Sequence, residues 1–124
     1  MELYGFFRSM AEQDRSAIVV CDTAHKIVYM NPAACDSYKK YGGASLLGTS
    51  LLSCHNESSR AKILRMLAWF GESRDNNIVH TYYNEKENKD VYMVALREQD
   101  GTLIGYYEKH EYRTRDNMPF YDLR

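Results

Sequence analysis

The segment 21–34, which reads CDTAHKIVYMNPAA, constrains the fold more than any other part of the sequence. Two short apolar runs, 18–21 and 27–30, flank a turn, and the step Asn31-Pro32 follows. Proline suits the first position of a helix because the N–H that it lacks has no partner there, and an asparagine before it can cap the exposed amides. This order predicts a β-hairpin that leads directly into a helix.

Hydrophobic spacing along the rest of the chain predicts further helices and strands. Apolar side chains follow the spacing of an amphipathic helix over 58–70. After Gly71 the period changes to that of a strand, and Asp100-Gly101 marks a hairpin turn. The predicted elements are a helix over 1–15, strands over 16–22 and 26–31, a helix over 32–41, brief helical turns over 44–55, a helix over 58–70, and strands over 78–83, 91–97 and 103–112.

This order of elements predicts a single α+β domain. A chain of 124 residues suffices for one hydrophobic core. Strands at both ends of a chain, with helices between them, usually close into one antiparallel sheet with the helices packed on one face. We therefore divide the chain into an N-terminal cap helix (1–15), a domain (16–113) and a C-terminal tail (114–124).

The first predicted helix carries an unusually aromatic stripe. Leu3, Phe6, Phe7 and Met10 recur at spacings that place them on one side of the helix. Such a stripe either covers the sheet of its own domain or also pairs with a second subunit. The second alternative predicts a homodimer formed through these four side chains.

Composition narrows the classes of partner. A net charge of −1 gives no general attraction to nucleic acid, and no apolar run approaches the ~20 residues that span a bilayer. The three cysteines lack the paired spacing of a disulfide framework or a zinc site. We expect a soluble cytoplasmic protein that binds neither nucleic acid nor a membrane.

The order and spacing of these motifs resemble the PAS domain family of intracellular sensor modules over 16–112. The resemblance rests on the hairpin turn at Asp22, the sequence Asn31-Pro32-Ala33-Ala34, the step Leu47-Gly48 and the hairpin at Asp100-Gly101. It implies a five-stranded antiparallel sheet in the order 2-1-5-4-3, with helices that enclose a small cavity against the sheet. The expected class is a stand-alone PAS-type sensor module.

Two features depart from the family pattern. His25 stands where the family often has glycine in the first hairpin turn, which leaves the type of that turn open. The last strand leads to a short tail, whereas the family often has an Asp-Ile-Thr type motif before a signalling coiled coil. Within this sequence we expect no attached effector domain.

The resemblance implies ligand binding for signal sensing. The chain lacks a phosphate-binding glycine loop, a nucleophile elbow and a zinc-protease helix. We expect no enzyme activity. A small apolar or amphipathic ligand would occupy the cavity and regulate a partner protein, and the alternative is a ligand-free interaction or dimerisation domain. A slip of one residue in a strand would exchange its faces. The predicted cavity residues are Val28, Met30, Tyr38, Leu52, His55, Ile63, Met66, Leu67, Tyr82, Met93 and Leu96.

His55 is the candidate for a cofactor ligand. The resemblance implies haem as a second alternative, because in haem-binding PAS domains a histidine of this helix region ligates the iron. The competing interpretation is that His55 and Asn56 cap the following helix. Cys54 lacks the Asn-Cys-Arg context of a flavin-reactive cysteine, and the pair His80 and His110 lacks a third metal ligand, so neither flavin nor a metal site is expected.

Overall fold

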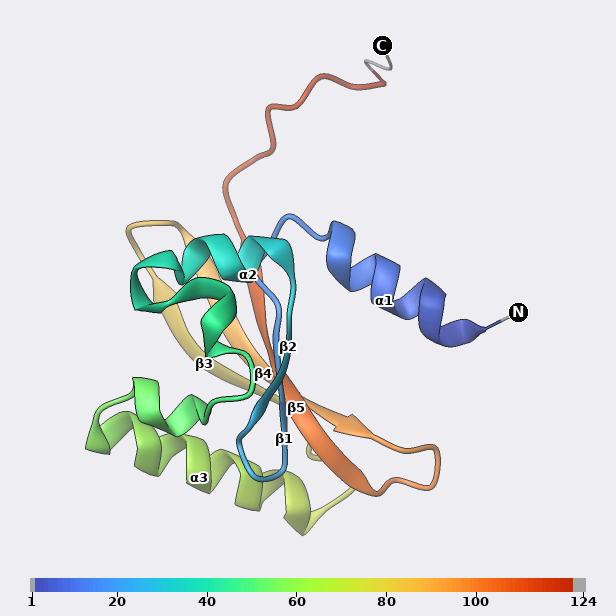
Figure 1. The fold of residues 1–124 in the computed structure, drawn as a ribbon, viewed down its shortest axis with the longest axis vertical. Helices are drawn as coiled ribbons and strands as arrows, with labels where there is room; N and C mark the ends of the chain where they lie inside the picture. Colours follow the sequence, from blue (N-terminus) through green and yellow to red (C-terminus); the bar gives the residue numbers. More distant parts are fainter. Residues whose placement is uncertain (1, 122–124) are drawn as a thin grey trace.

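We describe residues 2–121 of a computed structural model, apart from the side chain of Cys54. The chain forms one five-stranded sheet in the order β2-β1-β5-β4-β3, and every neighbouring pair is antiparallel (Figure 1). The predicted α+β class and strand order are therefore confirmed. The strands are β1 (Val19–Asp22), β2 (Ile27–Met30), β3 (Ile78–Asn84), β4 (Lys89–Arg97) and β5 (Leu103–Tyr112).

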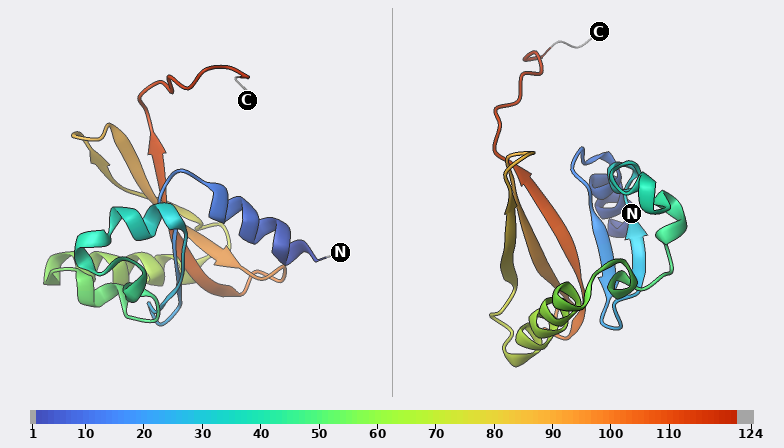
Figure 2. Two further views of the ribbon diagram at one scale, coloured as in Figure 1. Left: turned by 45° about the horizontal axis from the view of Figure 1, so that its top comes forward. Right: turned by 90° about the vertical axis from the view of Figure 1, so that its left-hand side faces the viewer.

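The helices between β2 and β3 lie on one face of this sheet (Figures 1 and 2). Asn31 and Asn56 cap the two α-helices of this region by accepting hydrogen bonds from backbone N–H groups. The predicted helix over 32–41 is divided near Tyr38 into an α-helical and a 3₁₀ part. The helices are α1 (Leu3–Gln13), α2 (Pro32–Ser37), α3 (Glu57–Glu72) and the 3₁₀ helices η1 (Lys39–Tyr41), η2 (Gly43–Leu46) and η3 (Leu51–Cys54).

The end of α3 is held by an arginine from the sheet. The guanidinium of Arg97, on β4, donates hydrogen bonds to the carbonyl oxygens of Phe70 at 2.7 Å and Ser73 at 3.1 Å. Carbonyl groups at a helix C-terminus have no partner within the helix, so a side chain that reaches them stabilises that end. The helix predicted over 58–70 ends two residues too early, because α3 continues to Glu72.

Two bulges set the faces of the edge strands. In the pairing of β1 with β2, Val20 lies opposite Tyr29 and Cys21 lies opposite Ile27, so Val28 is an extra residue. A second irregularity between His80 and Tyr82 interrupts the pairing of β3 with β4. Each bulge interrupts the regular alternation of side chains between the two faces. As a result Ile27 and Met30 are both buried in the core, although they are three positions apart.

The turn between β1 and β2 keeps its tight geometry through His25. This residue has φ of 66°, in the left-handed region where glycine is favoured. Its ring is buried, and Nδ1 lies 2.8 Å from the hydroxyl of Tyr106. The carboxylate of Asp22 accepts hydrogen bonds from the backbone N–H groups of Ala24 and Lys26. His25 therefore adopts a glycine-like backbone conformation and also fills a place in the core.

Helix α1 is present as predicted, but its apolar stripe does not lie on the sheet. The helix projects away from the other helices (Figures 1 and 2). Leu3, Phe6, Phe7 and Met10 are 52–68% exposed. The contacts that hold the helix come from its last turns, where Glu12 accepts a hydrogen bond from the Tyr29 hydroxyl. The interpretation of α1 as a lid on its own sheet was wrong, because its apolar stripe is exposed and the helix contacts β2 through polar side chains, including Arg8 over the ring of Tyr29.

Residues 113–121 follow β5 and extend away from the sheet (Figure 2). Among residues 2–121, no helix combines the length and the hydrophobicity needed to cross a bilayer. The division into cap helix, domain and tail stays a prediction.

Candidate functional site

A pocket of about 1140 Å³ lies between α3 and the inner face of the sheet. Its deep wall is mainly apolar and includes Ile27 and Met30 from β2, Ile63 and Met66 from α3, and Met93 from β4. The side chains along its border on α3 are exposed and mostly charged, as Lys62, Arg65 and Glu72 illustrate. Cavities with an apolar wall and a few polar groups are the usual form of small-molecule sites.

The pocket brings together seven of the eleven predicted cavity residues. Four of the predicted residues lie elsewhere. Leu52 and Leu67 are partly buried and pack against the hydrophobic core. Leu96 and Met93 are three positions apart in a regular part of β4, so their side chains lie on opposite faces of the sheet. Val28 is the extra residue of the bulge in β2 and is exposed. The predicted residues that line the pocket are Met30, Tyr38, His55, Ile63, Met66, Tyr82 and Met93.

The prediction missed the most polar residue of the deep wall, Glu108. This residue lies on β5 between Val19 of β1 and Met93 of β4, both of which are buried and line the pocket. Its side chain is only 15% exposed. A glutamate in a strand rich in charged residues is typical of a solvent-facing position, so the sequence pattern of β5 gave no sign of its burial. The pairing with Val19 and Met93 becomes visible only in the folded sheet.

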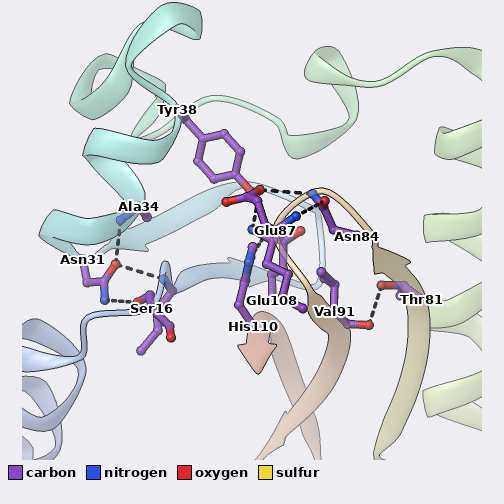
Figure 3. A network of polar contacts seen from close by, with 12 residues as sticks. Ser16, Asn31, Ala34, Tyr38, Thr81, Asn84, Glu87, Val91, Glu108 and His110 are labelled. Atoms are coloured by element: carbon purple, nitrogen blue, oxygen red, sulfur yellow. Dashed lines mark hydrogen bonds and ion pairs between the residues drawn. The ribbon is translucent and has the colours of Figure 1, made fainter. Parts of the chain in front are cut away.

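Glu108 is the centre of a buried polar network (Figure 3). Its Oε1 accepts a hydrogen bond from the Tyr38 hydroxyl at 2.6 Å and lies 2.7 Å from Nε2 of His110. Burial by itself would raise the pKa of Glu108, but the hydrogen bonds from His110 and Tyr38 and the nearby Lys89 outweigh it and lower this pKa. Glu108 is therefore a carboxylate at neutral pH.

The same environment disfavours the ionised forms of the neighbouring tyrosines. Burial, followed by the charge of Glu108 and its hydrogen bond, raises the pKa of Tyr38. Burial and the charge of Glu108 likewise raise the pKa of Tyr82. Both tyrosines line the pocket, so at neutral pH each offers it a hydroxyl group and an aromatic ring.

Lys89 and His110 complete the network beside the pocket. Lys89 is buried, and its Nζ lies 3.3 Å from Oε2 of Glu87. The side chain of His110 is 3% exposed, and its Nδ1 is buried with no hydrogen-bond partner in the described structure. The single hydrogen bond of the His110 ring therefore goes to Glu108.

The candidate cofactor ligands are dispersed. His55 lies on the wall of the pocket, at the end of η3. His80 and His110 bind different carboxylates, Asp90 at 2.8 Å and Glu108 at 2.7 Å. No group of three or more His, Cys, Asp or Glu side chains in the described part of the chain is arranged to hold a metal ion. The side chain of Cys54, the residue considered for flavin, lies outside the described structure.

Comparison with known proteins identifies the family. The profile of the family described as the PAS fold matches residues 11–109, and the chain therefore belongs to the PAS domain family. Members of this family serve as sensory modules in signalling proteins. A comparison with curated protein sequences finds no match.

Solved structures support the same fold. The PAS domain of BvgS from Bordetella pertussis has a TM-score of 0.65 and 15% identity, with 91% of this chain and 88% of that chain covered. A PAS domain from Colwellia psychrerythraea has a TM-score of 0.64 and 12% identity, with coverages of 90% and 97%. The Aer2 receptor from Vibrio cholerae has a TM-score of 0.56 and 14% identity, with coverages of 80% and 95%.

Proposed function

We propose that this chain is a cytoplasmic PAS-type sensor module that binds a small apolar or amphipathic molecule and regulates a partner protein. The observation that supports the proposal is the pocket of about 1140 Å³, which has an apolar wall and a deep polar network. Its volume is slightly above the range of about 300–1,000 Å³ that is usual for small-molecule sites. The proposal assigns the module a binding role and no catalytic role.

Regulation would act through α3. Ile63, Met66 and Phe70 attach this helix to the core, and the first two also line the pocket. A ligand that fits one packing of α3 better than another shifts the balance between them by its difference in affinity. The change would reach a signalling partner through α1 or through the outer face of the sheet.

We expect protein purified from its own host to carry the ligand. Native mass spectrometry of the folded protein should then show added mass that disappears on denaturation. Ala68→Trp should lower the occupancy because Ala68 is an exposed residue on the pocket wall, where an indole would fill space. Ala61→Trp is the matched control, since Ala61 is exposed on the same helix away from the pocket wall.

Repeated absence of added mass would contradict the sensor proposal and favour the alternative, a ligand-free interaction domain. Equal occupancy in the two tryptophan variants would contradict the assignment of the ligand to this pocket.

Haem is a second candidate ligand because His55 lies on the pocket wall. The Vibrio cholerae receptor with a similar fold is described as a dual PAS-heme oxygen sensor. In this chain His55 would hold the iron through an imidazole nitrogen, and the bound haem would supply a gas-binding iron centre. Absorbance of the same preparations separates the candidates: a Soret band that is lost in His55→Ala supports haem, and its absence after reconstitution contradicts it.

We also expect a homodimer formed through the stripe of Leu3, Phe6, Phe7 and Met10. Exposed apolar patches of this kind are typical of protein interfaces. Light scattering should give a dimer for the unaltered chain and a monomer for Phe7→Glu, because the new charge would be buried in the interface. Lys86→Glu, in the exposed turn between β3 and β4, should remain a dimer. A monomer at high micromolar concentration for the unaltered chain would contradict the expectation.

A further inference from the structure

The deep wall of the pocket holds a carboxylate whose hydrogen-bonding capacity is only partly used. Both recorded bonds to Glu108, from Tyr38 and His110, go to Oε1 (Figure 3). A carboxylate has about four acceptor positions on its two oxygens. Within residues 2–121, no side chain or backbone group donates a hydrogen bond to Oε2 of Glu108.

The possible ion-pair partner of this carboxylate is Nε2 of His110, which lies 2.7 Å from Oε1, and the lysine and arginine side chains around the pocket do not contact Oε2. The salt bridge of Lys89 goes to Glu87, with Nζ 3.3 Å from Oε2 of that residue. Lys62 and Arg65 lie on the exposed border of the pocket on α3, whereas Glu108 lies on the sheet. Tyr38 and His110 both contact Oε1, so a cation that reached Oε2 from the pocket would add a charge-assisted hydrogen bond at the oxygen that is still free to accept one.

The apolar surroundings restrict what can carry such a cation. Val19 and Met93 flank Glu108 across the sheet, and Met30, Ile63 and Met66 line the same pocket. A hydrated inorganic ion would gain nothing from these apolar side chains. An organic molecule with an apolar body would bury its surface against them while its charged end reached the carboxylate.

The geometry points to a ligand with a cationic amine at one end and an apolar body, in which the amine donates a hydrogen bond to Oε2 of Glu108. This inference rests on the proposed ligand-binding function and specifies the chemistry of the ligand. Ligands with a carboxylate at that end are disfavoured, because two like charges would meet in a site of low dielectric constant.

Three probes with the same carbon skeleton test the inference on the full chain: phenylbutylamine, phenylbutanol and phenylbutyrate. Calorimetric titration at neutral pH should show the amine binding about tenfold tighter than the alcohol, because the ammonium adds the attraction between opposite charges to a hydrogen bond that the hydroxyl can also donate. The acid should bind more weakly than the alcohol. The alcohol can also donate a hydrogen bond to the carboxylate but carries no charge, so it measures binding without the attraction between opposite charges.

Glu108→Gln should remove the preference for the amine over the alcohol while alcohol binding is retained. Glu111→Gln is the matched control, because Glu111 lies on the same strand with its carboxylate close to Lys109 and Arg113. This control should keep the preference. If Glu108→Gln does not fold, the test uses Tyr38→Phe, which removes one hydrogen-bond donor from Oε1 of Glu108. In this variant the preference for the amine should persist or increase. Loss of that preference would overturn the inference.

The outcomes distinguish this inference from the proposed function. Equal affinities for the three probes, tighter binding of the acid, or no binding of any probe at millimolar concentration would each overturn the inference. The proposed function is decided separately, by the mass carried by protein from its own host.

Discussion

Asn31→Ala is expected to lower the free energy of unfolding by roughly 3–5 kcal/mol. The side chain of Asn31 is fully buried and makes five hydrogen bonds to the backbone. Figure 3 shows those to Ser16 and Ala34. Its Oδ1 accepts from the N–H groups of Ile18 and Ala34. Its Nδ2 donates to one carbonyl oxygen in the last turn of α1 and to two in the segment between α1 and β1. Alanine would remove these hydrogen bonds, although the carbonyl oxygen of Ala11 would still accept one from the N–H of Asp14. Each buried backbone group left unsatisfied costs about 1–3 kcal/mol.

Asn56→Ala is the matched control for this prediction. Asn56 caps α3 in the same way, but it is exposed and its recorded side-chain bond is to the N–H of Ser59 at 2.8 Å. Its loss should cost only about 1 kcal/mol, the usual effect of removing a helix cap. Urea denaturation followed by circular dichroism measures both variants. Equal losses in the two would contradict the role of Asn31 as the link between α1, β1 and α2.

Gly105→Ala is expected to destabilise the sheet by several kcal/mol, on the order of the largest core effects. Gly105 lies on β5 opposite Asp22 of β1. A methyl group at this position would overlap the carbonyl oxygen of Cys21 and lie 3.2 Å from Cα of Asp22. Both are backbone atoms, so β1 would have to move away from β5 to make room.

Gly71→Ala is the matched control, and it is expected to raise the stability. Gly71 lies in the last turn of α3, and an added Cβ there would meet no atom within 4 Å. Alanine has a higher helix propensity, so this variant should gain up to about 1 kcal/mol. Thermal unfolding of both variants gives the comparison. An unchanged stability for Gly105→Ala would contradict the close approach of β1 and β5.

The sequence predicts the fold well because its strongest signals are local. The Asn31-Pro32 step marks the start of α2, and the change of hydrophobic period after Gly71 separates α3 from the strands that follow. Arg97 illustrates what such signals leave out. Its charge is typical of an exposed residue. Its guanidinium nevertheless donates hydrogen bonds to the carbonyl oxygens of Phe70 and Ser73, which are 27 and 24 residues away in the sequence.

The pocket is less predictable than the fold because it depends on long-range pairing. A bulge at Val28 shifts the faces of β2, and no feature of the local alternation of apolar residues indicates it. Met93 and Leu96 could not share a face in one regular strand, so strand geometry alone could have excluded one of them. The role of Glu108 depends on its neighbours Val19 and Met93 and on Tyr38, which come from three other elements.

A crystal structure of the chain purified from its own host tests the central proposal most directly. The proposal predicts continuous electron density for a small molecule beside Met66 and Met93, with one polar end within hydrogen-bond distance of Oε2 of Glu108. A pocket closed by the protein's own side chains, with α3 packed against the sheet and no such density, would contradict it.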